Sequence, residues 1–365
     1  MTPINAQESA PGTTSKPSTG QTKVQQIIKA VLTQRVILLG ALVLFVIVVM
    51  SIFDVSGMLA GSYNSDYLAS SLINAVPLVM LGLAQLIVIV SGRGGIDLSV
   101  GAIVSLVSMV FGFMYGEWGF PLLASIAAAV VVGAVLGAVN GIMVSYFGFP
   151  PLIATLATYY VFRSLAIVIN NQQPIGTAKI QNLYSLSNSV EIPLIGQTLP
   201  NIPLGIVLFL LPTVVLVWYL LNRAPYGRRL FAIGTNDIAA RWAGINVQSS
   251  RAIAYILSGA ISGLVAVVTV SQFASARPDA GDSGSGMALP SITIAVLAGV
   301  AITGGIGRVS GVVVATVLVI WLNAGILLLV VGNLGSQLQS LALGVILVFA
   351  ALLNGYTNRR YRVMG

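Results

Sequence analysis

Residues 36–53 read VILLGALVLFVIVVMSIF, an apolar run without a charged side chain. A helix that crosses the hydrocarbon core of a bilayer needs about 20 such residues. Comparable runs alternate with short polar or Gly- and Pro-rich segments along the chain, and of its 365 residues 57% are hydrophobic and only 7% are charged. We therefore expect an all-α membrane protein, a polytopic bundle for which lipid is the main solvent.

These runs predict about ten transmembrane helices. They cover roughly residues 36–53, 67–90, 97–115, 120–145, 151–171, 203–221, 252–272, 290–303, 310–330 and 336–355. The eighth run is short for a bilayer, so a broken or re-entrant segment is expected there, and a failure to cross would invert the topology after it. Residues 1–30 are polar and rich in turn formers, which predicts a disordered cytoplasmic tail before a single transmembrane domain at 31–365.

Lys and Arg set the orientation of the bundle, because they accumulate in short cytoplasmic loops. With the amino terminus inside, only Lys179 and Arg277 lie outside. The basic residues on the inside are Lys16, Lys23, Lys29, Arg35, Arg93, Arg223, Arg228, Arg229, Arg241, Arg251, Arg308, Arg359, Arg360 and Arg362. This distribution agrees with ten spans and two cytoplasmic ends.

The chain contains no Cys and no His. Thiol nucleophiles, imidazole bases and the common zinc ligand sets are therefore excluded, and we expect no catalytic and no metal-binding residues. The net charge of +8 is spread over loop ends rather than gathered on one face with aromatic residues. It therefore predicts no nucleic-acid partner.

Several polar side chains fall inside the predicted spans. Arg163 is the charged one, and an isolated charge there costs about 3 kcal/mol on insertion scales. It either faces a translocation path or bonds to exposed carbonyls of a neighbouring broken helix. The amides that are candidates for the same path, or for bonds between helices, are Asn74, Gln85, Asn140, Asn170 and Asn323.

Asp97 is a carboxylate at the edge of a span, where the third run begins. We expect it to cap that helix by accepting hydrogen bonds from its free backbone N–H groups. The alternative role is a proton or sodium site, which would make the chain a secondary transporter working alone.

Residues 222–250 read NRAPYGRRLFAIGTNDIAARWAGINVQSS and form the longest predicted cytoplasmic connection. A short amphipathic helix is expected within it, capped by Asp237, beginning near Ile238 and ended by Gly244. Such a helix fits into the groove of a partner protein. The alternative is an interfacial helix that Arg228, Arg229 and Trp242 hold against anionic headgroups.

Ala239, Ala240 and Gly244 resemble the Ala-Ala-x-x-x-Gly core of the loop through which permeases of ATP-binding-cassette (ABC) importers contact their ATPases, with Ile238 in place of the usual Glu. Residues 94–101 (GGIDLSVG) and 304–311 (GGIGRVSG) are similar to the ribose, xylose and galactose branch. Ala288 and Pro290 replace acidic residues of many members, which is more similar to permeases for autoinducer-2 or rhamnose. The ATPase-coupling residues that the resemblance implies are Gly234, Asn236, Asp237, Ala239, Ala240 and Gly244.

The resemblance implies a type II-like permease fold in a bacterial inner membrane, with ATP and Mg on a partner chain and no cofactor on this one. A cytoplasmic ATP-binding subunit, an extracytoplasmic substrate-binding protein and a second permease, identical or not, are the implied partners. The chain carries no Gly-x-x-x-x-Gly-Lys-Ser/Thr phosphate loop. An ion-coupled secondary transporter is the alternative, and a membrane-embedded enzyme lacks the usual acid, base and nucleophile residues.

Overall fold

The computed structural model describes residues 34–187, 189–190, 202–282 and 286–361. The predicted tail at 1–30 lies outside them. In the first half of the chain the elements are α2 (Arg35–Val55), α3 (Ser65–Ser71), α4 (Ala75–Val90), α5 (Val100–Phe111), the π-helix η1 (Gly112–Glu117), α6 (Leu122–Ser145), α7 (Pro151–Val168), α8 (Ala178–Asn182) and the 3₁₀ helix η2 (Leu183–Leu186).

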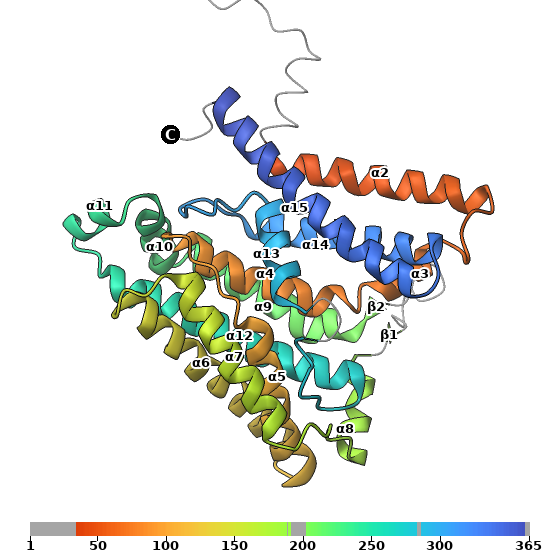
Figure 1. Cartoon of the computed structure of the whole chain (residues 1–365), viewed down its shortest axis with the longest axis horizontal. Helices are drawn as coiled ribbons and strands as arrows, with labels where there is room; N and C mark the ends of the chain where they lie inside the picture. The colour runs from red at the N-terminus through yellow and green to blue at the C-terminus, as the bar shows by residue number, and fades with distance from the viewer. Residues whose placement is uncertain (1–33, 188, 191–201, 283–285, 362–365) are drawn as a thin grey trace, which may run out of the picture.

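The second half begins with an antiparallel pair of two-residue strands, β1 (Ser189–Val190) and β2 (Ile202–Pro203). It continues with the π-helix η3 (Ile206–Leu210), α9 (Leu211–Asn222), α10 (Pro225–Thr235), α11 (Asp237–Trp242), α12 (Val247–Phe273), α13 (Ala288–Leu297), α14 (Val309–Leu329) and α15 (Asn333–Tyr361). The all-α polytopic architecture expected from the sequence is confirmed (Figure 1).

Seven helices of the described residues are long and apolar enough to cross a membrane, and two bent helix pairs raise the number to nine. The bent pairs are α3 with α4, at 49°, and η3–α9 with α10, at 66°. These nine correspond to nine of the ten predicted spans, so the count of ten is not confirmed. The remaining segment, predicted at 290–303, contains the ten-residue α13, which spans only about 15 Å.

The predicted span over 67–90 is present as a bent helix pair, because the chain breaks between α3 and α4. Pro77 has no N–H to donate to the carbonyl of Ile73 four residues earlier. The side chain of Gln272 donates to that carbonyl instead, at 2.7 Å. The break therefore has a local cause and a tertiary partner.

The segment around α13 still connects the two ends of the bundle. The stretch after α12 pairs with the chain before α8 through Ile175 and Ala276, whereas Gly305, after α13, donates its N–H to the carbonyl of Val90 at the end of α4. Non-helical backbone and a short helix thus share this crossing. The expectation of a broken segment is confirmed, because α13 is only ten residues long.

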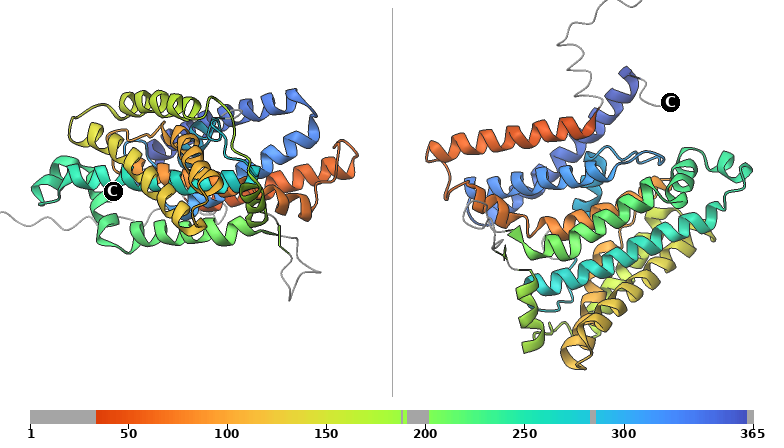
Figure 2. Two further views of the ribbon diagram at one scale, coloured as in Figure 1. Left: turned by 90° about the horizontal axis from the view of Figure 1, so that it is seen from below. Right: turned by 180° about the vertical axis from the view of Figure 1, so that it is seen from behind.

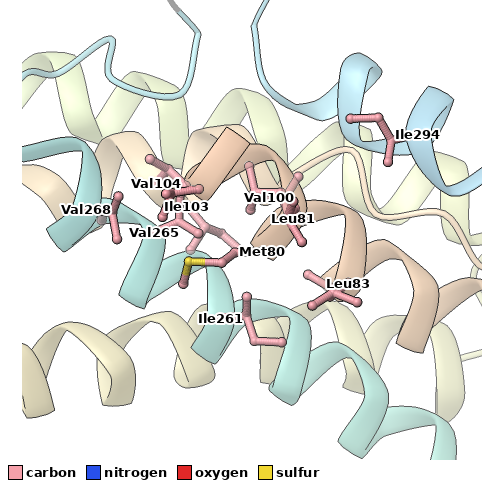
Figure 3. Packing of buried hydrophobic residues seen from close by; sticks show 14 of the residues in the cluster. Met80, Leu81, Leu83, Val100, Ile103, Val104, Ile261, Val265, Val268 and Ile294 are labelled. Atoms are coloured by element: carbon pink, nitrogen blue, oxygen red, sulfur yellow. The ribbon is translucent and has the colours of Figure 1, made fainter. Parts of the chain in front are cut away.

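Helix α4 lies at the centre of the bundle. All of its residues from Ala75 to Val90 are buried except the half-buried Leu78. Figure 3 shows Met80, Leu81 and Leu83 of this helix among apolar side chains of α5, α12 and α13. A helix that is apolar on all sides is expected at the core of a helical bundle.

Helices α6 and α12 pack closely along glycines. Gly133 and Gly137 of α6 face Gly259 of α12, and a Cβ atom at any of these positions would collide with backbone of the other helix. Small residues let helix backbones approach in this way in membranes. The contact holds α12 rigidly beside α6.

The two ends of the bundle carry different elements. In Figures 1 and 2 the start of α2 and the end of α15 lie toward the end that carries α10 and α11, and α3, α8 and the strand pair lie toward the other end. The start of α2, the end of α15 and the connection at residues 222–250 therefore lie toward one end of the bundle.

Candidate functional site

The predicted short helix in residues 222–250 is present as α11, which follows the longer α10. Its predicted cap is wrong by one residue. The side-chain oxygen of Asn236 accepts the N–H groups of Ile238 and Ala239, at 3.1 and 3.0 Å, and Asp237 is the first helical residue. The extended backbone of Asn236, where α10 ends, places that side chain over the free N–H groups of α11.

Gly244 ends α11 as predicted, with a left-handed backbone at φ +78°. Ala240 is buried against Ile233 and Val247, which fixes the inner side of the helix. On the outer side Ile238 is 66% and Trp242 89% exposed. An apolar surface of this kind on a polar connection fits a protein partner or a membrane surface.

Gly234 joins this connection to the core. It lies between the carbonyl of Val90 and the backbone of Gly305, and a Cβ atom at position 234 would overlap both. Gly92 also packs on Gly234. The Gly-rich segment at 304–311 therefore begins beside Gly92, two residues before the segment at 94–101, at the end of α10.

Arg251, at the start of the second turn of α12, is a residue that the sequence analysis placed only as a cytoplasmic charge. It is 1% exposed, and its Nε and Nη2 atoms donate to the carbonyl of Ser91 at 3.3 and 3.1 Å. Its Nη2 also lies 3.7 Å from Oδ2 of Asp237. One guanidinium thus joins α11, α12 and the end of α4. No local pattern signals this burial, because Ser91 is 160 positions away.

Asp97 lies fully buried between α4 and α5. Its Oδ1 accepts the N–H of Ser99 at 3.0 Å and the hydroxyl of Ser99 at 2.6 Å, and its Oδ2 accepts the hydroxyl of Ser258 at 3.1 Å. Asp97 does not cap α5 as predicted, because the N-cap residue is Ser99 and the bond to the Ser99 N–H closes a turn just before the helix. The hydroxyl bonds add a tie to α12 that the sequence analysis missed.

Two of the predicted amides join Asp97 in one cluster. Gln85 pairs with both backbone polar groups of Asp97, and Asn140 donates to the hydroxyl of Ser99 at 2.7 Å and accepts from Thr158 at 2.6 Å. We call this set the Asp97 cluster, and its side chains come from α4, α6, α7, α12 and the segment before α5. Its members are Gln85, Asp97, Ser99, Asn140, Thr158 and Ser258.

Arg163 of α7 pairs with a carboxylate rather than with backbone carbonyls. Its Nε lies 3.1 Å from Oδ2 of Asp282, whose side chain is 9% exposed, while that of Arg163 is 46% exposed. The guanidinium also faces the ring of Tyr159, 5.9 Å from its centre. Beside it opens a cavity of about 380 Å³ whose polar lining includes Gln172, Arg277 and Asp279. The partner Asp282 lies 119 positions away and was missed from sequence.

The other predicted path residues lie apart from these groups. Asn74 is exposed at the break before α4, and Asn170 bonds to the carbonyl of Gln173 in the turn after α7. Asn323 lies on α14, where its carbonyl accepts from Gln339 of α15. The structure therefore gathers Gln85 and Asn140, and leaves these three in separate places.

The long apolar helices, the broken central segments and the structured connection define a polytopic membrane permease. The chain belongs to the family described as "Branched-chain amino acid transport system / permease component", whose model matches residues 67–352. It is a multi-pass inner-membrane subunit of an importer, and the alternative of a secondary transporter acting alone is not supported.

Among curated proteins the chain is similar to the autoinducer 2 import system permease protein LsrD. The identity is 33% with the protein of Photorhabdus luminescens, over 79% of this chain and 80% of the relative. It is 33% with that of Yersinia enterocolitica, over 79% and 81%, and 32% with that of Klebsiella pneumoniae, over 80% and 82%. No solved structure matches.

Proposed function

We propose that this chain imports a sugar or a sugar-like small molecule of the autoinducer-2 type, as the transmembrane half of an ABC importer. The names of its relatives and its similarity to them support this substrate class. Within the importer the chain acts as a conduit and not as an enzyme. ATP and Mg belong to a cytoplasmic partner, and an extracytoplasmic binding protein delivers the substrate to a dimer of permeases.

The observation that carries the proposal is the form of α11. Ile238 and Trp242 present apolar surface outward, while Ala240 packs inward. A six-residue helix cannot be stable alone, so its capping by Asn236 and its packing against the bundle hold it ready for a partner. We assign Gly234, Asn236, Asp237, Ala239, Ala240 and Gly244 to the contact with the ATPase.

Closure of two ATPase subunits would push α11 as a rigid body and switch the permease between outward-open and inward-open states. Arg163 at the outer cavity and the amides Gln85 and Asn140 are the polar groups that we assign to the path or to its walls. Hydroxyl groups of a sugar pair well with amide and guanidinium donors.

Substitution of Gly244 tests the role of α11. No atom lies within 4 Å of a Cβ at this position, so a side chain there meets no neighbour, but the left-handed backbone at φ +78° strains most residues other than Gly. Gly244→Leu is expected to abolish uptake and co-purification of the ATPase while membrane insertion persists. Gly244→Asn is the matched control, because Asn tolerates the left-handed backbone, and it should retain both. Normal uptake in Gly244→Leu would argue against the contact.

A further inference from the structure

The helix α12 carries a stripe of three buried polar side chains that runs from the connection at residues 222–250 to the Asp97 cluster. Arg251, Tyr255 and Ser258 are spaced by four and three residues, so they share one face of the helix. Arg251 contacts Asp237 of α11 at one end, and Ser258 donates to Asp97 at the other. The stripe thus joins the surface proposed for the ATPase to the middle of the bundle.

A buried cation is tolerated only with a nearby anion and with acceptors for its N–H groups. Arg251 donates to one carbonyl, that of Ser91, and lies beside one carboxylate, that of Asp237. Arg93 and Arg241 are close enough to repel it. The charge balance of Arg251 therefore depends on where α11 holds Asp237.

Tyr255 lies between the two ends of the stripe. Its ring packs on Val88 and Val144, and its hydroxyl has no hydrogen-bond partner among the described residues although the side chain is fully buried. An unpaired buried hydroxyl costs free energy.

We propose that Arg251 is the positioning residue that transmits a displacement of α11 to the Asp97 cluster, through its paired contacts with Asp237 and with the carbonyl of Ser91. When α11 moves, Asp237 moves with it. Arg251 then loses its counter-charge unless it follows, and it carries the end of α4 and the first turn of α12 along. The inference rests on the proposed function only for the cause of the displacement of α11, which is the closure of the ATPase subunits.

The chain contains no Cys, so spin labels can be placed at will. Labels at Trp242→Cys on α11 and Leu123→Cys at the far end of α6 occupy exposed positions. In the full chain in lipid nanodiscs the distance distribution between them is expected to be narrow. Arg251→Met and Asp237→Asn are each expected to broaden it, because either change frees α11 from the core, and Arg251→Lys should restore part of the narrow form.

Arg241→Gln is the matched control, since Arg241 is an exposed arginine on α11. It should not broaden the distribution, because its removal only relieves repulsion of Arg251. Asp237→Asn removes only a partly exposed charge, so it decides the question even where Arg251→Met fails to fold. An unchanged distribution in Asp237→Asn, or an equal broadening in Arg241→Gln, would overturn the proposal.

A second measurement uses the complex with the co-purifying ATPase. Substrate moved per ATP hydrolysed is expected to fall about tenfold in Arg251→Lys, the size of an ordinary coupling between sites, while the ATPase still binds. Loss of ATPase binding in Arg251→Lys, or a normal ratio, would contradict the transmission role. If Gly244→Leu leaves ATPase binding intact, the proposed contact between α11 and the ATPase is wrong. The spin-label result still decides whether Arg251 links α11 to α12.

Discussion

The side-chain amide of Gln85 holds the backbone of Asp97 by two hydrogen bonds, one in each direction. Its Nε2 donates to the carbonyl of Asp97 at 2.5 Å, and its Oε1 accepts the N–H of Asp97 at 3.2 Å. The amide acts as a neighbouring strand would, at a depth where no water serves the non-helical backbone. The break between α4 and α5 is stable because of this pair.

Replacing Gln85 by Met tests this role. The change keeps the volume but leaves a buried N–H and a buried carbonyl without partners, which costs about 1–3 kcal/mol for each group. We expect a clear fall in the thermal midpoint of the chain in detergent. Gln173→Met, at an exposed position, is the matched control and should change stability by less than about 0.5 kcal/mol. Equal midpoints for the two variants would contradict this account.

Substitutions of Asp97 distinguish a structural carboxylate from an ion-coupling site. Asn at this position keeps an acceptor for the N–H of Ser99 and offers a donor to the hydroxyl of Ser258, so uptake driven by ATP should persist in Asp97→Asn. Asp97→Ala removes the acceptor of three donors and should destabilise the chain by about 2 kcal/mol or more.

The measurement is uptake into proteoliposomes that contain the complete importer, with and without a proton or sodium gradient. A gradient dependence that disappears in Asp97→Asn would restore the ion-site interpretation. Uptake that ignores the gradient in both forms supports a structural carboxylate.

The sequence predicts the spans well, because transfer of a long apolar run from water to lipid is a strong and local signal. It predicts the breaks of helices within those spans poorly. The break before α4 depends on Pro77, which is visible, but also on Gln272, which substitutes for the missing donor from another helix. The hydrophobicity of a local stretch carries no information about a hydrogen-bond partner nearly 200 positions away in the sequence.

The same limit applies to the candidate sites. The helix α11 and its end at Gly244 follow from local residues, whereas the choice between Asn236 and Asp237 as the cap depends on where α10 stops. Arg163 is visible as a costly intramembrane charge, but its partner Asp282 comes from a distant loop. The sequence therefore shows which polar residues need a partner, but it does not show which residues are those partners.

Gly234 is expected to tolerate no side chain. Ala at this position would drive a methyl group into the carbonyl of Val90 and the backbone of Gly305, and such overpacking costs about 1–3 kcal/mol. We expect Gly234→Ala to lower the thermal midpoint and to disturb coupling together. Gly344→Ala is the control, since no atom lies within 4 Å of its Cβ in the helix α15. A Gly234→Ala variant as stable as Gly344→Ala would show that the junction adapts.

The ion pair between Arg163 and Asp282 gives the final prediction. Arg163 is nearly half exposed, so the pair adds only about 0.5–1 kcal/mol to stability, and its removal should leave folding intact. Its position beside the cavity lined by Gln172 and Arg277 predicts instead a loss of uptake in Arg163→Met and in Asp282→Asn.

The double variant that exchanges the two charges separates the two possible causes of that loss. If the pair only ties α7 to the loop before α13, the exchange should restore uptake, because the attraction is the same in either direction. If Arg163 itself meets the substrate, the exchange restores the thermal midpoint but not uptake. We expect the second result, since Arg163 is 46% exposed while Asp282 is 9% exposed, and only the arginine can reach a solute in the cavity. Full uptake in the exchanged variant would assign the pair to structure alone.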